Sequence, residues 1–275
     1  MPKTIAALGV AGTQGGSVAS HFLSLGWNVR GISRSSTSSS AEALKAKGID
    51  VVQADVDDPQ TLIPAFRGAH VIFAVTDFWA PYFAAFEEKS KISDRETGEY
   101  AYAIEVHRRK NIVDAADVML KEEGSKLERF VSSTLPGFKE QSKGKHTYAY
   151  HFDSKADITS YLKEKNELWE KSSLLNMGFY ADNIIWYGGF MGAAKPCEPT
   201  AVHPFVIPGD TGLFVSLLVN SPPKQDLLGV SEIGREVAES TATSAEFGWG
   251  DKLILPWQTS GVASLSVANY FLGIC

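Results

Sequence analysis

The chain has 275 residues, of which 44 % are hydrophobic and 21 % charged, a balance that suits one large α/β domain or two small ones. Its formal net charge of −6 excludes a globally basic surface, so direct binding of nucleic acid is not expected. Cys197 and Cys275 have neither disulfide nor metal-site spacing, and no apolar run reaches the length of a membrane span. The first residues lack the basic and long apolar regions of a secretory signal, so none is expected. We therefore expect no metal, no membrane segment and a reducing compartment.

The first predicted strand, residues 4–8, runs directly into a glycine-rich loop. A strand, a glycine loop and a helix start in this order are typical of a dinucleotide-phosphate site. In such a loop Gly9 permits the tight turn, Gly12 lets the backbone approach a pyrophosphate, and Gly15 lets the helix pack closely on the strand. A glycine-rich structural turn is the alternative interpretation.

Two polar residues, Thr13 and Gln14, lie between these glycines at the expected helix start. The first N–H groups of a helix and the positive end of its dipole favour an anion. We therefore place Thr13 and Gln14 with the glycines in the predicted cofactor site.

Strand and helix patterns alternate through residue 177, which predicts a parallel sheet with right-handed crossovers. Helices are expected over about 100–121 and 153–164. The remaining strands are expected at residues 28–32, 49–54, 69–75, 127–133 and 172–177. The predicted fold is a doubly wound α/β sheet, the Rossmann fold, with a smaller substrate-side region.

Two segments interrupt this rhythm: a serine-rich loop at 33–40, and residues 178–207, which are rich in Gly, Pro and aromatics. We predict a dinucleotide-binding core at 1–177. Residues 178–275 are expected to be mainly substrate-side, with a helix near 210–220 returning to the core.

The choice of dinucleotide depends on the end of the second strand, where an acidic residue would favour NAD. No acid stands there, and Arg34 with Ser35 predicts NADP, although a solvated loop arginine is the alternative. Asp55 is placed to face the adenine or to cap a helix. Val75 and Thr76, after the fourth strand, are expected to line the nicotinamide-ribose side.

Two further clusters stand out. The aromatic run at 78–83 predicts a substrate wall or a partner surface. The basic run at 107–110 falls on a predicted helix, so we expect a solvated face there and not a nucleic-acid reader.

Three motifs resemble the NmrA-like family of atypical short-chain dehydrogenase/reductases. They are GVAGTQGGSV at 9–18, HFDSKA at 151–156 and NMGFYADN at 176–183, and the resemblance covers roughly residues 4 to 230. It implies binding of NADP or NAD. The family includes redox-sensing transcriptional co-regulators and reductases, some of them in secondary metabolism.

The resemblance also implies site residues. A typical short-chain dehydrogenase uses a serine, a tyrosine and, four residues after the tyrosine, a lysine. Lys155 stands in the lysine position and His151 in the tyrosine position. The family's serine is expected at the end of the fifth strand, where Ser132, Ser133 and Thr134 lie, and Ser133 is the catalytic candidate among them. Lys155 would hold the cofactor ribose. His151 would act as an acid, or else as a structural or ribose-contacting residue.

The third motif supplies Phe179, Tyr180 and Asn183, just after the sixth strand. Open α/β sheets bind ligands at this edge, so we expect these residues to face cofactor or substrate. The alternative is that they anchor the following loop.

These expectations favour an NADP(H)-dependent oxidoreductase that acts on a small-molecule carbonyl, imine or enone. The alternative is a non-catalytic regulator that senses the NADP/NADPH ratio and binds a protein partner. The expected compartment is the cytoplasm, or the nucleus for a regulator, and a homodimer is left open.

Overall fold

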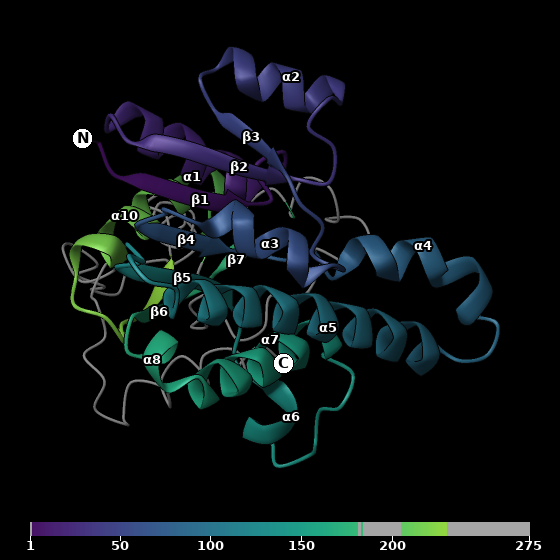
Figure 1. Ribbon diagram of the computed structural model, residues 1–275. Coiled ribbons are helices and arrows are strands. Elements are labelled where there is room, and N and C mark those ends of the chain that lie inside the picture. The colour runs from purple at the N-terminus through teal and green to yellow at the C-terminus, as the bar shows by residue number, and fades with distance from the viewer. Residues whose placement is uncertain (1, 181–182, 184–204, 230–275) are drawn as a thin grey trace, which may run out of the picture.

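Seven parallel strands form one sheet in the order β3-β2-β1-β4-β5-β6-β9. The computed structural model describes residues 2–180, 183 and 205–229 (Figure 1). The strands are β1 (Thr4–Leu8), β2 (Asn28–Ser33), β3 (Asp50–Gln53), β4 (Val71–Ala74), β5 (Arg129–Thr134), β6 (Ser172–Met177) and β9 (Asp226–Gly229). The first six follow the order of a doubly wound dinucleotide fold, so the predicted fold class is confirmed.

Helices cover both faces of this sheet. They are α1 (Thr13–Ser24), α2 (Ser39–Ala46), α3 (Pro59–Phe66), α4 (Trp79–Lys89), α5 (Asp94–Leu120), α6 (Phe138–Gln141), α7 (Tyr150–Glu164), α8 (Asn166–Trp169) and α10 (Thr211–Asn220). A second small sheet pairs β7 (Phe179–Tyr180) with β8 (Phe205–Val206), and a 3-10 turn, η1 (Pro208–Asp210), precedes α10. Figure 1 shows the long helix α5 running beside α3 and α7.

Alternating strand residues fill two separate cores. In β1, Ala6 and Leu8 pack with residues of α3, α5 and α7, whereas Ile5 and Ala7 pack with residues of α1, α2 and α10. This alternation follows from the two-residue period of a strand. Both faces of the sheet are buried, as expected of a parallel sheet between helices.

Some predicted boundaries need correction. The serine-rich segment at 33–40 is a loop only in part, because α2 begins at Ser39 and the Ser38 hydroxyl accepts a hydrogen bond from the Ala41 N–H. The side chain that caps α3 is Asp58 and not Asp55. Most of 178–207, both cysteines and the end of the chain lie outside the described residues.

Several short elements have no counterpart in the predicted strands and helices, among them α4, α6, α8 and β9. The helix expected near 210–220 is α10, and it packs on α1. Its buried residues join the core on the α1 side of the sheet. The division of the chain into two functional regions stays a prediction.

The contact between β1 and α1 depends on two glycines. Gly9 has a φ of +66°, a left-handed conformation that L side chains rarely adopt. A Cβ on Gly15 would lie 2.3 Å from the Gly9 carbonyl oxygen and 2.4 Å from that of Leu8. The close approach places the N-terminus of α1 at the carboxyl end of β1.

Gly15→Ala is expected to destabilise the fold by about 1–3 kcal/mol, because the added methyl group meets backbone that cannot yield without moving the helix. Gly16→Ala is the matched control, since its Cβ would meet nothing closer than 3.3 Å. The free energy of urea-induced unfolding measures both variants. Equal values for the two would contradict the packing role of Gly15.

Candidate functional site

The N-terminus of α1 has the geometry of an anion-binding site. Its N-cap residue is Gly12, and no side chain caps this end. The Gly12 N–H donates to the Gly9 carbonyl at 2.8 Å, which closes the turn. The amides of the first helical turn have no acceptor within the helix. They lie where the strand order reverses between β1 and β4, so the loop fits a dinucleotide phosphate.

The third motif reaches this loop. The Gln14 side-chain amide donates to the hydroxyl of Tyr180, which lies in β7. Burial raises the pKa of the Tyr180 phenol, so the phenol keeps its proton at neutral pH. Phe179 and Asn183 are half-buried. Tyr180 therefore lies against the glycine loop, and its role, like those of Phe179 and Asn183, stays a prediction.

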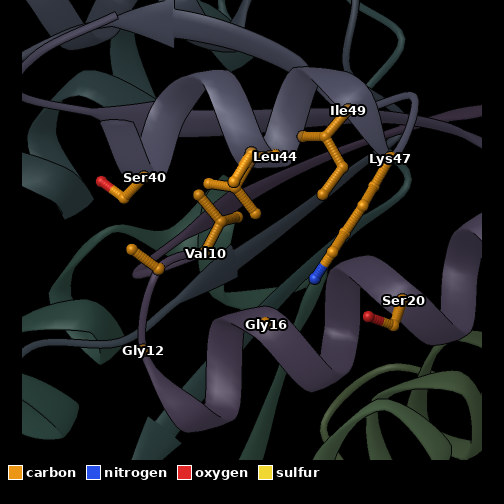
Figure 2. A pocket seen from close by; sticks show the side chains of 10 residues that line it. Val10, Gly12, Gly16, Ser20, Ser40, Leu44, Lys47 and Ile49 are labelled. Carbon is orange, nitrogen blue, oxygen red and sulfur yellow. The ribbon is translucent and has the colours of Figure 1, made fainter. Parts of the chain in front are cut away.

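A crevice lies beside the glycine loop, between α1 and α2 (Figure 2). Its volume is about 340 Å³. Lys47 extends from the end of α2 toward α1 in Figure 2. The lining residues are Val10, Ala11, Gly12, Gly16, Ser20, Ser40, Ala43, Leu44, Lys47 and Ile49. Lys47 is not among the predicted site residues, because an exposed helix lysine carries no distinguishing pattern.

The residues predicted to choose the dinucleotide lie on the loops after β2 and β3. Arg34 is exposed at the end of β2. The Ser33 hydroxyl accepts from the Ser35 N–H at 3.3 Å and donates to the Ser35 carbonyl at 3.0 Å, which holds this turn. The Asp55 carboxylate accepts from the Asp57 N–H at 3.0 Å, so it shapes the turn before α3.

A buried carboxylate organises the other half of the site. Glu105 of α5 is 0 % exposed. It accepts hydrogen bonds from the ammonium of Lys155 at 2.9 and 3.0 Å, from the hydroxyl of Thr76 at 2.7 Å and from that of Ser154 at 2.5 Å. The structure therefore brings Lys155 and Thr76, both predicted site residues, to one acceptor. Val75, just before Thr76, lies against Gly9.

The Lys155 ammonium also donates to the carbonyl of His151, one helical turn earlier, at 3.1 Å. Burial lowers the pKa of Lys155, and the carboxylate of Glu105 opposes that shift. The ammonium is thus held by acceptors on two helices.

Arg109 was expected on the solvated face of the basic run at 107–110, and this expectation is wrong. Its side chain is buried, and its guanidinium donates to the Ala74 carbonyl at 2.8 Å and to the Ser133 carbonyl. Burial lowers its pKa to about 10. Arg109 lies four residues after Glu105 and three before Ile112, a spacing that places all three on one face of α5. This spacing is the sequence signal that indicates a buried Arg109.

His151 lies among aromatic rings. Its ring centroid is 4.7 Å from that of Phe152, 4.9 Å from that of Trp79 and 5.8 Å from that of Phe78. Burial, and secondarily the charge of Lys155, lowers the pKa of the imidazole to about 4. The ring is therefore neutral at pH 7, which argues against His151 as a proton donor.

The hydroxyl side chains of neighbouring residues at the end of β5 point to opposite faces of the sheet. Thr134 bonds to the Lys155 carbonyl at 3.2 Å and to the Thr159 hydroxyl at 2.9 Å, on the side of α7. Ser133 shares the face of Val131, which packs with residues of α1 and α10. The Ser133 hydroxyl therefore lies across the sheet from Lys155, and its catalytic role stays a prediction.

Within residues 2–180, 183 and 205–229, no cluster of three or more His, Cys, Asp or Glu side chains has the arrangement of a metal site. No helix in this part of the chain is both long and apolar enough to cross a membrane.

The burial of His151 predicts a pH-dependent stability. The folded imidazole takes a proton only near pH 4, whereas the unfolded one does so near 6.5. Between these values the unfolded state binds more protons, so this term stabilises the fold above pH 6.5 and is lost as the pH falls. The loss amounts to at most about 3 kcal/mol.

Urea unfolding across this pH range tests the prediction. His151→Gln is expected to remove part of the pH dependence, whereas His146→Gln, at an exposed position, leaves it intact. The same slope in all three proteins would show that His151 does not titrate as described.

Two curated proteins resemble a part of this chain. An NmrA-like family domain-containing oxidoreductase of Aspergillus campestris is 42 % identical over 76 residues, which are 27 % of this chain and 22 % of that protein. A second such oxidoreductase, from an Aspergillus species, is 35 % identical over 82 residues, 30 % of this chain and 24 % of that protein. The matched segments thus span about a quarter of these relatives or less.

Solved structures share the fold at low identity. NmrA, a negative transcriptional regulator, in complex with NADP has a TM-score of 0.58 and 20 % identity over 81 % of this chain and 63 % of that chain. An Escherichia coli NADPH-dependent quinone oxidoreductase complexed with NADPH has a TM-score of 0.52 and 17 % identity, over 79 % and 65 % of the two chains. The profile of the NmrA-like family matches residues 1–233. The chain therefore belongs to the NmrA-like family.

Proposed function

We propose that this protein is an NADP(H)-dependent oxidoreductase of the atypical short-chain dehydrogenase/reductase type. Its substrate would be a small molecule with a carbonyl, imine or enone. The observation that carries this proposal is a site in two halves, an uncapped helix N-terminus after β1 and a buried lysine held beside the segment after β4. The names of the two Aspergillus relatives, and neighbours solved with NADP and NADPH, support it.

Each half of the site has a separate task. The turn at Gly12 would receive the pyrophosphate on backbone N–H groups. Arg34 would pair with a 2′-phosphate, while Lys155 and Thr76 would hold the nicotinamide ribose. The bound cofactor supplies the hydride, and the chain supplies orientation and electrostatics.

The source of the proton is the less usual part of this proposal. A neutral His151 is a poor acid at pH 7, because its ring keeps no second proton. Tyr180 retains its phenolic proton, and its oxygen accepts a hydrogen bond from the side-chain amide of Gln14 in the glycine motif. We assign Tyr180 as the alternative donor to the substrate oxygen or nitrogen.

A second function is a non-catalytic regulator that reads the NADP/NADPH ratio and binds a protein partner. The neutral, aromatic-packed His151 in the position of the usual tyrosine favours it. Trp79, Phe83 and Phe86 are exposed on α4 and would form the partner surface. An enzyme would work in the cytoplasm, and a regulator also in the nucleus.

The two functions predict different turnover. With a panel of carbonyls, imines and enones, the enzyme oxidises NADPH, and Lys155→Met lowers kcat/KM by about 100-fold. Loss of nicotinamide absorbance measures the reaction. Lys163→Met, an exposed change on the same helix, is the matched control. No turnover, together with a partner whose affinity follows the NADP/NADPH ratio, would establish the regulator.

Arg34→Ala tests the choice of cofactor. Losing a guanidinium–phosphate contact is expected to weaken NADP binding by about 10-fold or more, with little effect on NAD. Isothermal titration calorimetry measures both affinities, and Arg67→Ala, an exposed arginine that pairs with Glu122, is the control. Equal weakening of NADP and NAD would contradict the assignment of Arg34.

A further inference from the structure

Glu105 is buried beside two of the residues proposed to hold the cofactor, Thr76 and Lys155. It lies on the inward face of α5 and accepts four hydrogen bonds from the side chains of Thr76, Ser154 and Lys155. An ionised carboxylate has about four acceptor positions. The four hydrogen bonds therefore match the acceptor capacity of an ionised carboxylate.

This anion lies between two buried cations. Lys155 contacts it directly, and Arg109, one turn further along α5, is within electrostatic range. Asp77, in the turn before α4, also attracts Lys155, while His151 of α7 is neutral. Glu105 thus supplies the directly bonded negative charge that holds the Lys155 ammonium.

The same contacts fix the direction of the hydroxyl protons. A carboxylate only accepts hydrogen bonds, so the Thr76 hydroxyl must point its proton at Glu105. The lone pairs of Thr76 are then left for a donor from outside the cluster. Ser154 points its proton at Glu105 in the same way, but it is 0 % exposed and cannot meet a ligand.

We propose that Glu105 is a positioning residue of the nicotinamide side of the site. It keeps Lys155 as an ammonium, one of whose N–H groups would turn from the His151 carbonyl to a ligand hydroxyl. It also turns Thr76 so that the Thr76 hydroxyl accepts from a ligand hydroxyl or amide N–H. Glu105 itself touches no ligand. The inference rests on the proposed binding of NADP(H), whose ribose and carboxamide carry these groups.

The variant Glu105→Gln removes the negative charge of this side chain and keeps its size and shape. Without the anion, burial and the charge of Arg109 both disfavour the Lys155 ammonium. Lys155 would then release its proton at a lower pH. Above that pH it would be a neutral amine, which is a weaker hydrogen-bond donor to the cofactor.

The test is the dissociation constant of NADPH, measured by fluorescence titration between about pH 6 and about pH 9. Glu105→Gln is expected to weaken binding by about 10-fold at the alkaline end and by about 2-fold or less at the acidic end. In a Lys155→Met background, adding Glu105→Gln is expected to change the constant by less than about 2-fold. A loss that is the same at every pH, or undiminished in that background, overturns the proposal.

Two controls keep the outcome clear. Glu164→Gln, an exposed carboxylate on α7, is expected to leave NADPH binding unchanged at every pH. If Glu105→Gln fails to fold, as judged by circular dichroism, Thr76→Val replaces it. Loss of the acceptor is then expected to weaken NADPH binding by about 10-fold, and an unchanged constant overturns the proposal. Wild-type protein that does not bind NADPH overturns the proposed function itself.

Discussion

The buried carboxylate of Glu105 joins α5 to α7 and to the segment that follows β4. Burying an unpaired charge costs several kcal/mol, so such a group must gather donors around it. Here the donors include Lys155 and Thr76, two residues predicted to touch a cofactor. One requirement of folding therefore also sets the position and the polarity of the candidate site.

The second constraint is the contact of α1 with β1. Gly15 lets the helix approach the strand, and Gly12 is the N-cap residue, so no side chain caps the start of the helix. The N-terminus of α1 follows β1, and Lys155 lies beside the segment that follows β4. The strands β1 and β4 are neighbours in the sheet. The strand order brings the two halves of the candidate site to one edge of the sheet.

The sequence predicted those parts of the structure that depend on local pattern. The apolar runs located the strands, and the glycine spacing located the turn that Gly9 adopts. It did not predict Glu105 or Arg109, because a charged residue on a helix is ordinarily read as exposed. Their burial is set by partners distant in the chain. The neutral state of the His151 ring depends on its packing against Trp79 of α4, and no pattern in the sequence indicates this contact.

The most direct test is a crystal structure of the protein with bound NADP. The account predicts a pyrophosphate on the first-turn amides of α1. It also predicts a nicotinamide ribose or carboxamide within about 3.5 Å of both the Lys155 ammonium and the Thr76 hydroxyl. A nucleotide bound with neither group in contact would contradict the central claim, that the Glu105 cluster prepares the nicotinamide side of the site.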